Sequence, residues 1–234
     1  MSKKTFQNLS STTLFNFTNT FTHLANHLEN GFYCGDVYEK FPFGLNIGYK
    51  VPMVCFCDIP LGQVKEHLVW YGSYAIGIKK AYARKHNVSP VWYIHSNNPV
   101  VLKMYRSTNK DELRNSPVLP YLKQYLGNQK DLNKKVRMKK FYDEREWRFI
   151  PLQDNFKAEI MIGSHAANEA EVEKRKRVTR MNLDLHEVEY IIVSKEEEKE
   201  KLYPILRKLS LKHKVKYENL VSAIITCSQI RKDF

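Results

Sequence analysis

Short β-strand patterns alternate with short helical patterns along this chain, and this order restricts its fold more than any other feature. The runs "TLFNFT" (13–18), "MVCF" (53–56) and "EVEYIIV" (187–193) are rich in β-branched and aromatic residues, as strands are. A helical pattern with a stripe of Phe21, Leu24 and Leu28 follows the first run and ends at Gly31. Because no internal repeat or low-complexity linker interrupts the order, we expect a single α+β domain over residues 1–234. Its core would be a split, twisted mixed β-sheet of about six or more strands, with the helix Phe21–Asn30 packed on it.

Three segments depart from this alternation. Residues 1–12 are polar, and we expect them to form a flexible N-terminus. Residues 103–140 are polar and basic and predict a helical insertion, and Phe32–Tyr49 predicts a long loop that serves as a lid or binding loop.

The stretch "YDEREWRFIP" (142–151) places two glutamates in a run that otherwise resembles a strand. With the period of two typical of strands, Glu144, Glu146 and Arg148 share one face, while Trp147 and Phe149 share the other. Neighbouring carboxylates repel each other, so the pattern indicates either a cationic partner or a catalytic use. The alternative is an ionic ladder on a solvated face, with Trp147 packed inward.

The 38 Lys and Arg residues exceed the 25 Asp and Glu residues, which gives a formal net charge of +13. Such a charge favours a polyanion as partner, although a Lys-rich soluble protein would also carry it. The cations cluster in "KKVRMKK" (134–140) and "KRKRVTR" (174–180). The residues expected to contact nucleic acid phosphates are Lys134, Lys135, Arg137, Lys139, Lys140, Lys174, Arg175, Lys176 and Arg177.

Several classes of protein are disfavoured by what the sequence lacks. It has no run of 18 apolar residues and no apolar segment behind its charged N-terminus, which predicts a cytoplasmic protein without a membrane partner. The four cysteines show neither a disulfide framework nor zinc-ligand spacing, and His165 in "GSHAANE" is better explained as a turn residue. We therefore expect no metal site.

Four stretches together resemble the AbiGi family of bacterial abortive-infection proteins, which confer phage resistance. They are "LFNFTNTFTHLANHLENGFY", "MVCFCDIP", "YGSYAIGI" and "EREWR", and the resemblance extends from about Leu14 into the helix after Ser194. It implies a role in antiviral defence within a toxin–antitoxin pair, with a cognate toxin or antitoxin as partner.

The same order of elements resembles, more weakly, that of ADP-ribosyltransferases. This resemblance implies an ADP-ribosyltransferase-like sheet, with NAD as the substrate that donates ADP-ribose. It implies that Glu146 is the catalytic carboxylate and that Glu144 orients or deprotonates the acceptor. The residues that it implies for NAD binding are Asn16, Thr18, Tyr33, Phe56 and Cys57.

Two positions depart from the ADP-ribosyltransferase pattern. Asn16 stands where a His or Arg is usual, and Cys57 stands where a Ser is expected. The leading hypothesis is a toxin-type, NAD-dependent ADP-ribosyltransferase that modifies a nucleic acid. The alternative is a non-catalytic antitoxin or regulator that binds nucleic acid or protein, which Asn16 favours. A nuclease ranks last, because only Asp58 and the two glutamates would be available to bind its metal.

Overall fold

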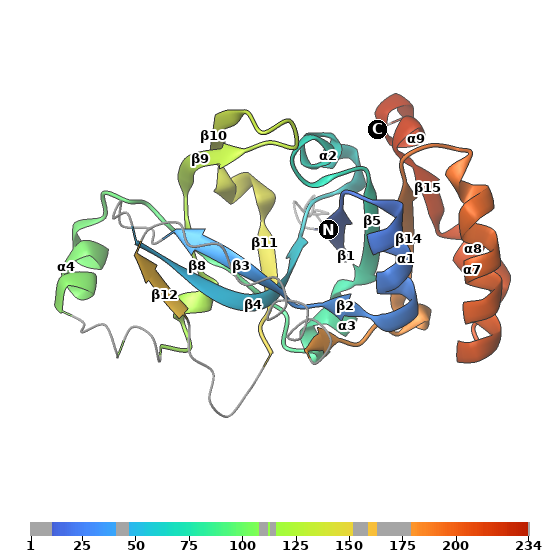
Figure 1. Ribbon diagram of the computed structural model, residues 1–234, viewed down its shortest axis with the longest axis horizontal. Helices are drawn as coiled ribbons and strands as arrows, with labels where there is room; N and C mark the ends of the chain where they lie inside the picture. The colour runs from blue at the N-terminus through green and yellow to red at the C-terminus, as the bar shows by residue number, and fades with distance from the viewer. Residues whose placement is uncertain are drawn as a thin grey trace, which may run out of the picture.

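One long strand, β4 (Ile47–Cys57), joins two parts of a nine-stranded sheet in the computed structural model of this protein (Figure 1). The residues that the structure describes are 11–40, 47–107, 112, 116–151, 159–162 and 179–233. The first half of β4 pairs with β3 (Gly35–Lys40) and β12 (Glu159–Ile162), and its last four residues pair with β11 (Glu146–Phe149). A single strand thereby holds segments that lie far apart in the sequence.

The order of strands in this sheet is β15-β14-β5-β1-β4-β11-β6, with β3 and β12 paired to β4 outside that path. Strands β14 and β15 are parallel, whereas the other pairs are antiparallel. The remaining strands of the path are β1 (Thr13–Thr18), β5 (Tyr74–Lys79), β6 (Ser89–Pro90), β14 (Val188–Val193) and β15 (Ile224–Thr226). The predicted α+β class, the mixed sheet and the single domain are therefore confirmed.

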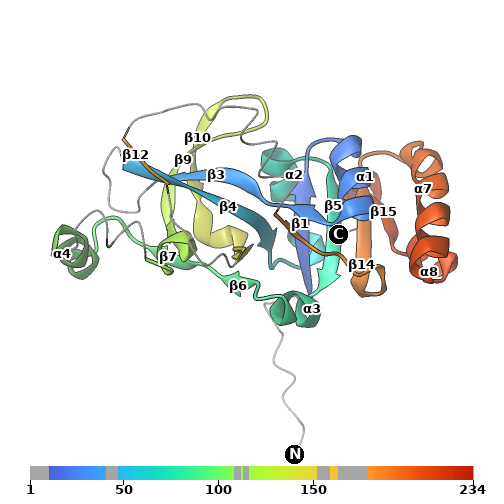
Figure 2. The ribbon, with the colours of Figure 1, turned by 60° about the horizontal axis from the view of Figure 1, so that its bottom comes forward.

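Helices cover both faces of the sheet on the β14–β15 side (Figures 1 and 2). On one face, α1 (Phe21–Asn30) buries Leu24 and Leu28 in a cluster with Leu14, Ile76 and Ile191 of the sheet, so the predicted packing of this helix on the sheet is confirmed. Leucines of α7 (Glu198–His213) belong to the same cluster. On the other face, α2 (Lys65–Tyr71) and α9 (Cys227–Asp233) enclose a smaller apolar cluster. The other helices are α3 (Lys80–Lys85), α4 (Pro99–Ser107), α8 (Tyr217–Ser222) and the 3₁₀ turns Leu61–Gln63, Leu119–Tyr121, Phe141–Glu144 and Leu185–Glu187. No helix among the described residues is both long enough and apolar enough to cross a membrane.

Sequence and geometry agree at both ends of α1. The hydroxyl of Thr20 accepts a hydrogen bond from the backbone N–H of His23 and caps the first turn. Gly31 ends the helix with φ +82°, and a Cβ there would lie 2.6 Å from the backbone oxygen of Met181. Glycine is required at this position for both reasons.

The predicted helical insertion over residues 103–140 is wrong beyond α4. The chain instead forms β8 (Leu122–Gln124), which pairs in parallel with β7 (Trp92–Ile94), and then an antiparallel hairpin of β9 (Leu126–Lys130) and β10 (Val136–Lys140). The hairpin forms because Asp131 stabilises its turn: its Oδ1 accepts hydrogen bonds from the backbone N–H groups of Asn133 and Lys135, each at 2.9 Å.

The predicted loop over Phe32–Tyr49 is also largely β-structure. Phe32–Tyr33 form β2, which pairs with β13 (Arg180–Met181), and β3 pairs with β4 along six residues. The ring of Tyr38 covers Gly48 on the opposite strand, where a Cβ would lie only 2.3 Å from the ring. The ring of Tyr38 thus packs on a sheet and does not belong to a loop. The expected flexible N-terminus lies outside the described residues apart from Ser11 and Thr12.

Candidate functional site

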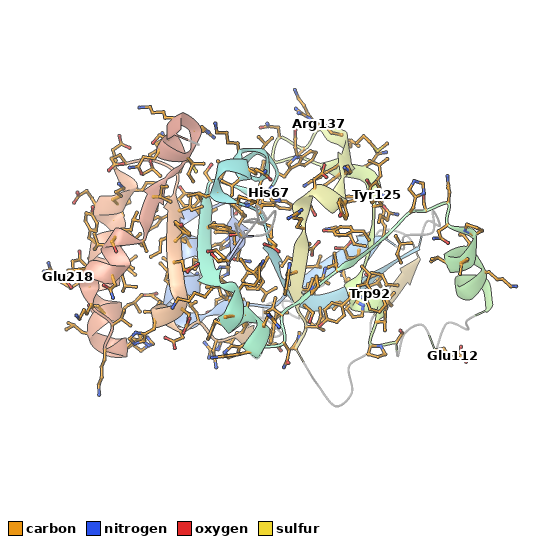
Figure 3. All side chains as sticks on the ribbon, turned by 180° about the vertical axis from the view of Figure 1, so that it is seen from behind. His67, Trp92, Glu112, Tyr125, Arg137 and Glu218 are labelled. Atoms are coloured by element: carbon orange, nitrogen blue, oxygen red, sulfur yellow. The ribbon has the colours of Figure 1, made fainter. Side chains whose placement is uncertain are left out.

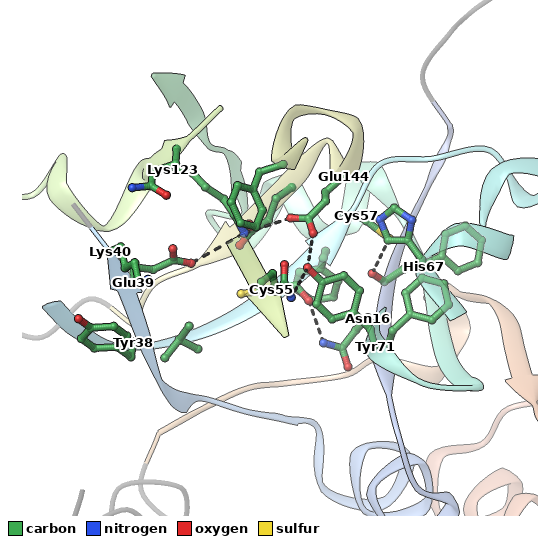
Figure 4. Close-up of a pocket in the computed structure, with 18 of the residues that line it drawn as sticks. Asn16, Tyr38, Glu39, Lys40, Cys55, Cys57, His67, Tyr71, Lys123 and Glu144 are labelled. Atoms are coloured by element: carbon green, nitrogen blue, oxygen red, sulfur yellow. Dashed lines mark hydrogen bonds and ion pairs between the residues drawn. The ribbon is translucent and has the colours of Figure 1, made fainter. Parts of the chain in front are cut away.

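A cavity of about 370 Å³ lies where strands β1 and β4 separate. The two strands share a single paired position, Phe15 with Cys57 at the end of β4, and Cys57 is also paired with Glu146 of β11. Helix α2 and the hairpin β9–β10 enclose this space, which Figure 4 shows in close-up. This cavity is our candidate site, because its lining brings together side chains from β1, β3, β4, α2, β8, β9 and β11.

Glu146 lies at the base of the cavity, with both carboxylate oxygens bound to cations. Arg148 donates from Nε to Oε1 at 2.6 Å and from Nη2 to Oε2 at 3.3 Å, and the ammonium group of Lys123 donates to Oε2. Burial alone would raise the pKa of Glu146, but Arg148 and Lys123 hold it well below its usual range. The carboxylate is therefore ionised and neutralised by two cations.

Glu144 reaches the same cavity from a different local structure. It ends the 3₁₀ turn Phe141–Glu144, and Arg145 follows in the left-handed region with φ +47°. The predicted strand thus begins only at Glu146, yet the turn still directs Glu144 inward, where it is 4% exposed. Its carboxylate accepts hydrogen bonds from Lys139 and the hydroxyl of Tyr71 and lies 3.1 Å from Lys123. Burial opposes ionisation, but Lys123 and Lys139 hold the pKa of Glu144 below its usual value.

Arg148 is the largest fully buried side chain among the described residues. Besides Glu146, it donates to the carbonyl oxygen of Pro120 and to Glu39, each at 2.6 Å. Three carboxylates (Glu39, Glu144, Glu146) thus face three cations (Lys123, Lys139, Arg148). The ionic face of β11 is consequently buried and balanced in charge, which excludes the solvated ladder considered above.

The pairing of β11 with β4 determines which residues lie on each face of β11. Glu146 lies opposite Cys57 and Arg148 opposite Cys55, whereas Trp147 lies opposite Phe56. Trp147 and Phe149 pack against the main apolar core, as the period-two pattern predicted. All four cysteines are free thiols, and burial raises the pKa of Cys57 far above its usual value.

The five residues expected to bind NAD divide into two groups. Asn16, Phe56 and Cys57 line the cavity, together with Glu144 and Glu146, whereas Thr18 and Tyr33 are not part of its lining. Thr18 ends β1, and Tyr33 lies in β2 beside His27, with the ring centroids 6.2 Å apart. Asn16 donates from Nδ2 to the backbone oxygen of Cys55 at 2.9 Å and so bridges the separating strands.

Sequence reasoning missed several cavity residues, among them His67 and Tyr71 of α2, Lys123 of β8 and Gln129 of β9. His67 is one of the lining residues in Figure 4, and its ring contacts those of Phe17 and Tyr71. Burial lowers the pKa of His67 to about 4, so its imidazole is neutral near pH 7. The spacing of His67 and Tyr71 by one helical turn was the available signal.

The expected nucleic-acid residues do not all lie on one surface. Lys134, Lys135, Arg137 and Lys140 are exposed, and Figure 3 shows Arg137 at the outer edge of the hairpin. Lys139 is buried instead, because alternation along β10 turns it inward to Glu144 and Tyr71. Lys174, Arg175, Lys176 and Arg177 lie outside the described residues, as does His165.

The cavity combines aromatic walls with an ionic base. Aromatic side chains and the amide of Asn16 suit a flat ring that carries an amide or amine. Glu146, in contrast, would have to release Lys123 before it could receive a ribose hydroxyl. As for a nuclease, Asp58 pairs with Lys80 at 2.7 Å away from the cavity lining, and the described residues contain no cluster of three or more His, Cys, Asp or Glu that could hold a metal.

Comparison with known proteins relates most of the chain to one group. The family model described as "Putative abortive phage resistance protein AbiGi, antitoxin" matches residues 47–194. A relative named "Abortive phage resistance protein AbiGi", from Lactococcus lactis subsp. cremoris, is 24% identical over 223 aligned residues, which cover 80% of this chain and 90% of the relative. No solved structure matches, so the ADP-ribosyltransferase-like form of the sheet remains an expectation.

Proposed function

Because this chain belongs to the AbiGi family of abortive phage resistance proteins, we propose that it acts in phage defence as a non-catalytic antitoxin. The observation that carries the proposal is the state of Glu146, whose two oxygens are both occupied by Lys123 and Arg148. The wording of the family description supports the same role. The buried ion pairs then serve to hold the fold together.

The ion pairs argue against catalysis by Glu146 on electrostatic grounds. A carboxylate that stabilises a cationic transition state must direct its charge toward the reacting atoms. Here the guanidinium group of Arg148 and the ammonium group of Lys123 already take up that charge within hydrogen-bonding distance. Freeing Glu146 would leave Lys123 without its closest partner in a buried site, which costs several kcal/mol.

The partner in this proposal is the cognate toxin, which an antitoxin binds. Nucleic acid is a second partner within the same proposal. Exposed cations on the hairpin β9–β10, namely Lys134, Lys135, Arg137 and Lys140, give it a basic outer surface that suits phosphates. The carboxylate of Asp131 lies 3.1 Å from Nε of Arg137, and that of Asp143 lies 3.1 Å from Nζ of Lys140. Arg137 and Lys140 are therefore partly neutralised, and Lys134 and Lys135 matter most.

A second candidate function is NAD-dependent ADP-ribosyl transfer, and one observation favours it. Asn16, Phe56, Cys57, Glu144 and Glu146 were assigned to one reaction from separate parts of the sequence, and the fold gathers all five around one cavity. In this reading Glu146 would hold the ribose and Glu144 the acceptor. NAD, as the substrate bound there, would supply the ADP-ribose group.

The substitution Glu146→Gln separates the two functions, since it keeps the shape of the side chain and removes only its charge. For an antitoxin we expect that unmodified protein consumes no NAD and that the variant still neutralises the toxin and supports phage resistance. Glu29→Gln on the surface of α1 is the matched control. NAD consumption by the unmodified protein that Glu146→Gln abolishes would overturn the proposal. If the variant does not fold in a thermal melt, NAD turnover by the unmodified protein decides the question.

A further inference from the structure

Three polar atoms in the cavity lack a hydrogen-bond partner among the described residues. They are Oδ1 of Asn16, Nε2 of His67 and Oε1 of Gln129; each atom is buried, and each belongs to a side chain of a residue that lines the cavity. Leaving a buried polar group unpaired costs about 1–3 kcal/mol, so such groups are rare without a reason. Three of them around one cavity indicate that a ligand completes them.

The hydrogen bond made by one end of the Asn16 amide shows which of its two polar atoms is unpaired. Nδ2 donates to the backbone oxygen of Cys55, which can only accept. The amide therefore cannot be rotated by half a turn, and the unpaired atom is the oxygen, an acceptor. The side chain is only 9% exposed, so its position is fixed by the strand on which it lies.

Gln129 is oriented by similar reasoning. The hydroxyl of Tyr71 donates its proton to Glu144, so its oxygen accepts from Lys139 and from Nε2 of Gln129. The carbonyl oxygen of Gln129 is consequently the free end, a second acceptor. His67 is neutral, because its pKa is lowered to about 4, and can either donate or accept through Nε2.

The walls of the cavity are aromatic, and its base carries no excess charge. Rings of Phe15, Phe17, His67 and Tyr71 contact one another in sequence along one wall, with centroid distances of 6.1, 5.9 and 5.9 Å. The carboxylates at the base are matched by Lys123, Lys139 and Arg148. A flat neutral ring can stack on this wall, whereas a charged group at the base would find the charges there already paired. Lys40, an exposed cation of the lining, lies outside these pairs.

We propose that this cavity binds a neutral planar heteroaromatic ring with N–H donors on its edge, of the nucleobase or carboxamide class. The donors would bind the oxygens of Asn16 and Gln129, and the ring would stack on the aromatic wall. A volume of about 370 Å³ accommodates one such ring with a sugar. The proposal goes beyond the antitoxin function, because it concerns what the cavity holds and requires neither a toxin nor a reaction.

The test is calorimetric titration of the full-length protein with adenosine, cytidine and nicotinamide. The matched ligand is N6,N6-dimethyladenosine, which keeps the adenine ring but lacks the N–H donors of the amine. We expect at least one of the three probes to bind, with dimethyladenosine about tenfold weaker than adenosine if adenosine is that ligand. Asn16→Ala and Gln129→Ala should each weaken binding about tenfold, while Thr22→Ala, at an exposed position of α1 outside the cavity, should not.

Further titrations identify the source of the ring. Tightest binding of NAD would indicate a dinucleotide, and tightest binding of single-stranded oligodeoxyadenylate would indicate an unpaired base. The proposal is overturned if none of the three probes binds up to millimolar concentration, or if the variants bind as the unmodified protein does. For a variant that fails a thermal melt, the comparison of the probe that binds with its N,N-dimethyl analogue on the unmodified protein stands in its place, and equal affinities overturn the proposal. Failure of this proposal would leave the antitoxin function untouched, because that function is tested by toxin neutralisation.

Discussion

At the scale of single residues, Lys123 is central to the ion pairs of the site, although nothing in the sequence around it predicted this role. Its ammonium group contacts Glu146, lies 3.1 Å from Glu144 and 3.8 Å from Glu39, and is almost fully buried. Burial lowers the pKa of Lys123, but the three carboxylates raise it well above its usual value. Lys123 therefore stays charged and holds together three segments of the chain.

Replacing Lys123 with Met should destabilise the protein by about 3–5 kcal/mol, because two buried carboxylates lose their shared cation. Chemical denaturation at pH 7 measures the free energy of unfolding, and Lys130→Met on the exposed side of β9 is the control. The loss should shrink as pH falls toward 4, since Glu144 and Glu146, each left with one cation, then take up protons more readily. A change of less than about 0.5 kcal/mol, as for an exposed ion pair, would contradict this account.

Site residues within one short stretch of the sequence were predicted correctly, whereas a site residue from a distant segment was missed. The period of two placed Glu146 and Arg148 on one face of a strand and Trp147 on the other, as the structure shows. Lys123 was missed because its segment was expected to be helical, and only the fold brings β8 next to Glu146. Whether an ionic face is solvated or buried depends on such tertiary contacts, which periodicity does not contain.

At the scale of elements, the hairpin β9–β10 was the largest error of sequence reasoning. A polar segment without an apolar stripe predicts neither a buried helix nor a half-buried strand. In this segment the residues of the turn determined that the chain forms a hairpin. Asp131 is only 5% exposed and binds the backbone of both Asn133 and Lys135. The segment "DLNKK" held the turn signal that would have corrected the prediction.

Asp131→Ala should loosen this hairpin locally, at a cost of about 1–3 kcal/mol for the two hydrogen bonds of the turn. The backbone N–H groups of β9 and β10 should exchange with deuterium faster, while those of β5 and β14 keep their protection. Asn133→Ala changes an exposed side chain in the same turn and serves as the control. Unchanged exchange in β9 and β10 would show that the turn does not depend on Asp131.

At the scale of the whole molecule, the net charge of +13 predicts salt-sensitive binding to RNA or DNA. Replacing Lys134, Lys135, Arg137 and Lys140 with Glu should weaken binding and flatten the log–log salt dependence by about 0.7–0.9 for each phosphate that the protein no longer neutralises. Lys139 is left unchanged, because it is buried against Glu144. The same charge change on α7, at Lys201, Arg207, Lys208 and Lys212, is the matched control, since α7 lies at the far side of the molecule (Figure 1). If the unmodified protein binds neither RNA nor DNA at low salt, the charge of the hairpin serves only solubility.

The stability of the whole chain should also depend on pH through His67, which is 7% exposed. Burial lowers its pKa from 6.5 to about 4, so between these values the unfolded chain binds a proton that the folded chain does not. The stabilisation is complete above pH 6.5 and falls by roughly 3 kcal/mol as pH drops to 4. His67→Phe should flatten this part of the curve of unfolding free energy against pH, whereas His213→Phe on the exposed end of α7 should not. Equal slopes for the two variants would contradict the assignment.

The buried guanidinium group of Arg148 also fixes the alignment of its strand. Sliding β11 by one residue along β4 would turn Arg148 into the apolar core and Trp147 toward the carboxylates. Both faces of this strand are covered, so a strand shifted by one residue would bury its charged side chains among apolar ones. Because a buried cation without its partners is far more costly than a misplaced methyl group, the misaligned strand is excluded by charge. The ion pairs thus select one arrangement of the sheet among those that hydrophobic packing would allow.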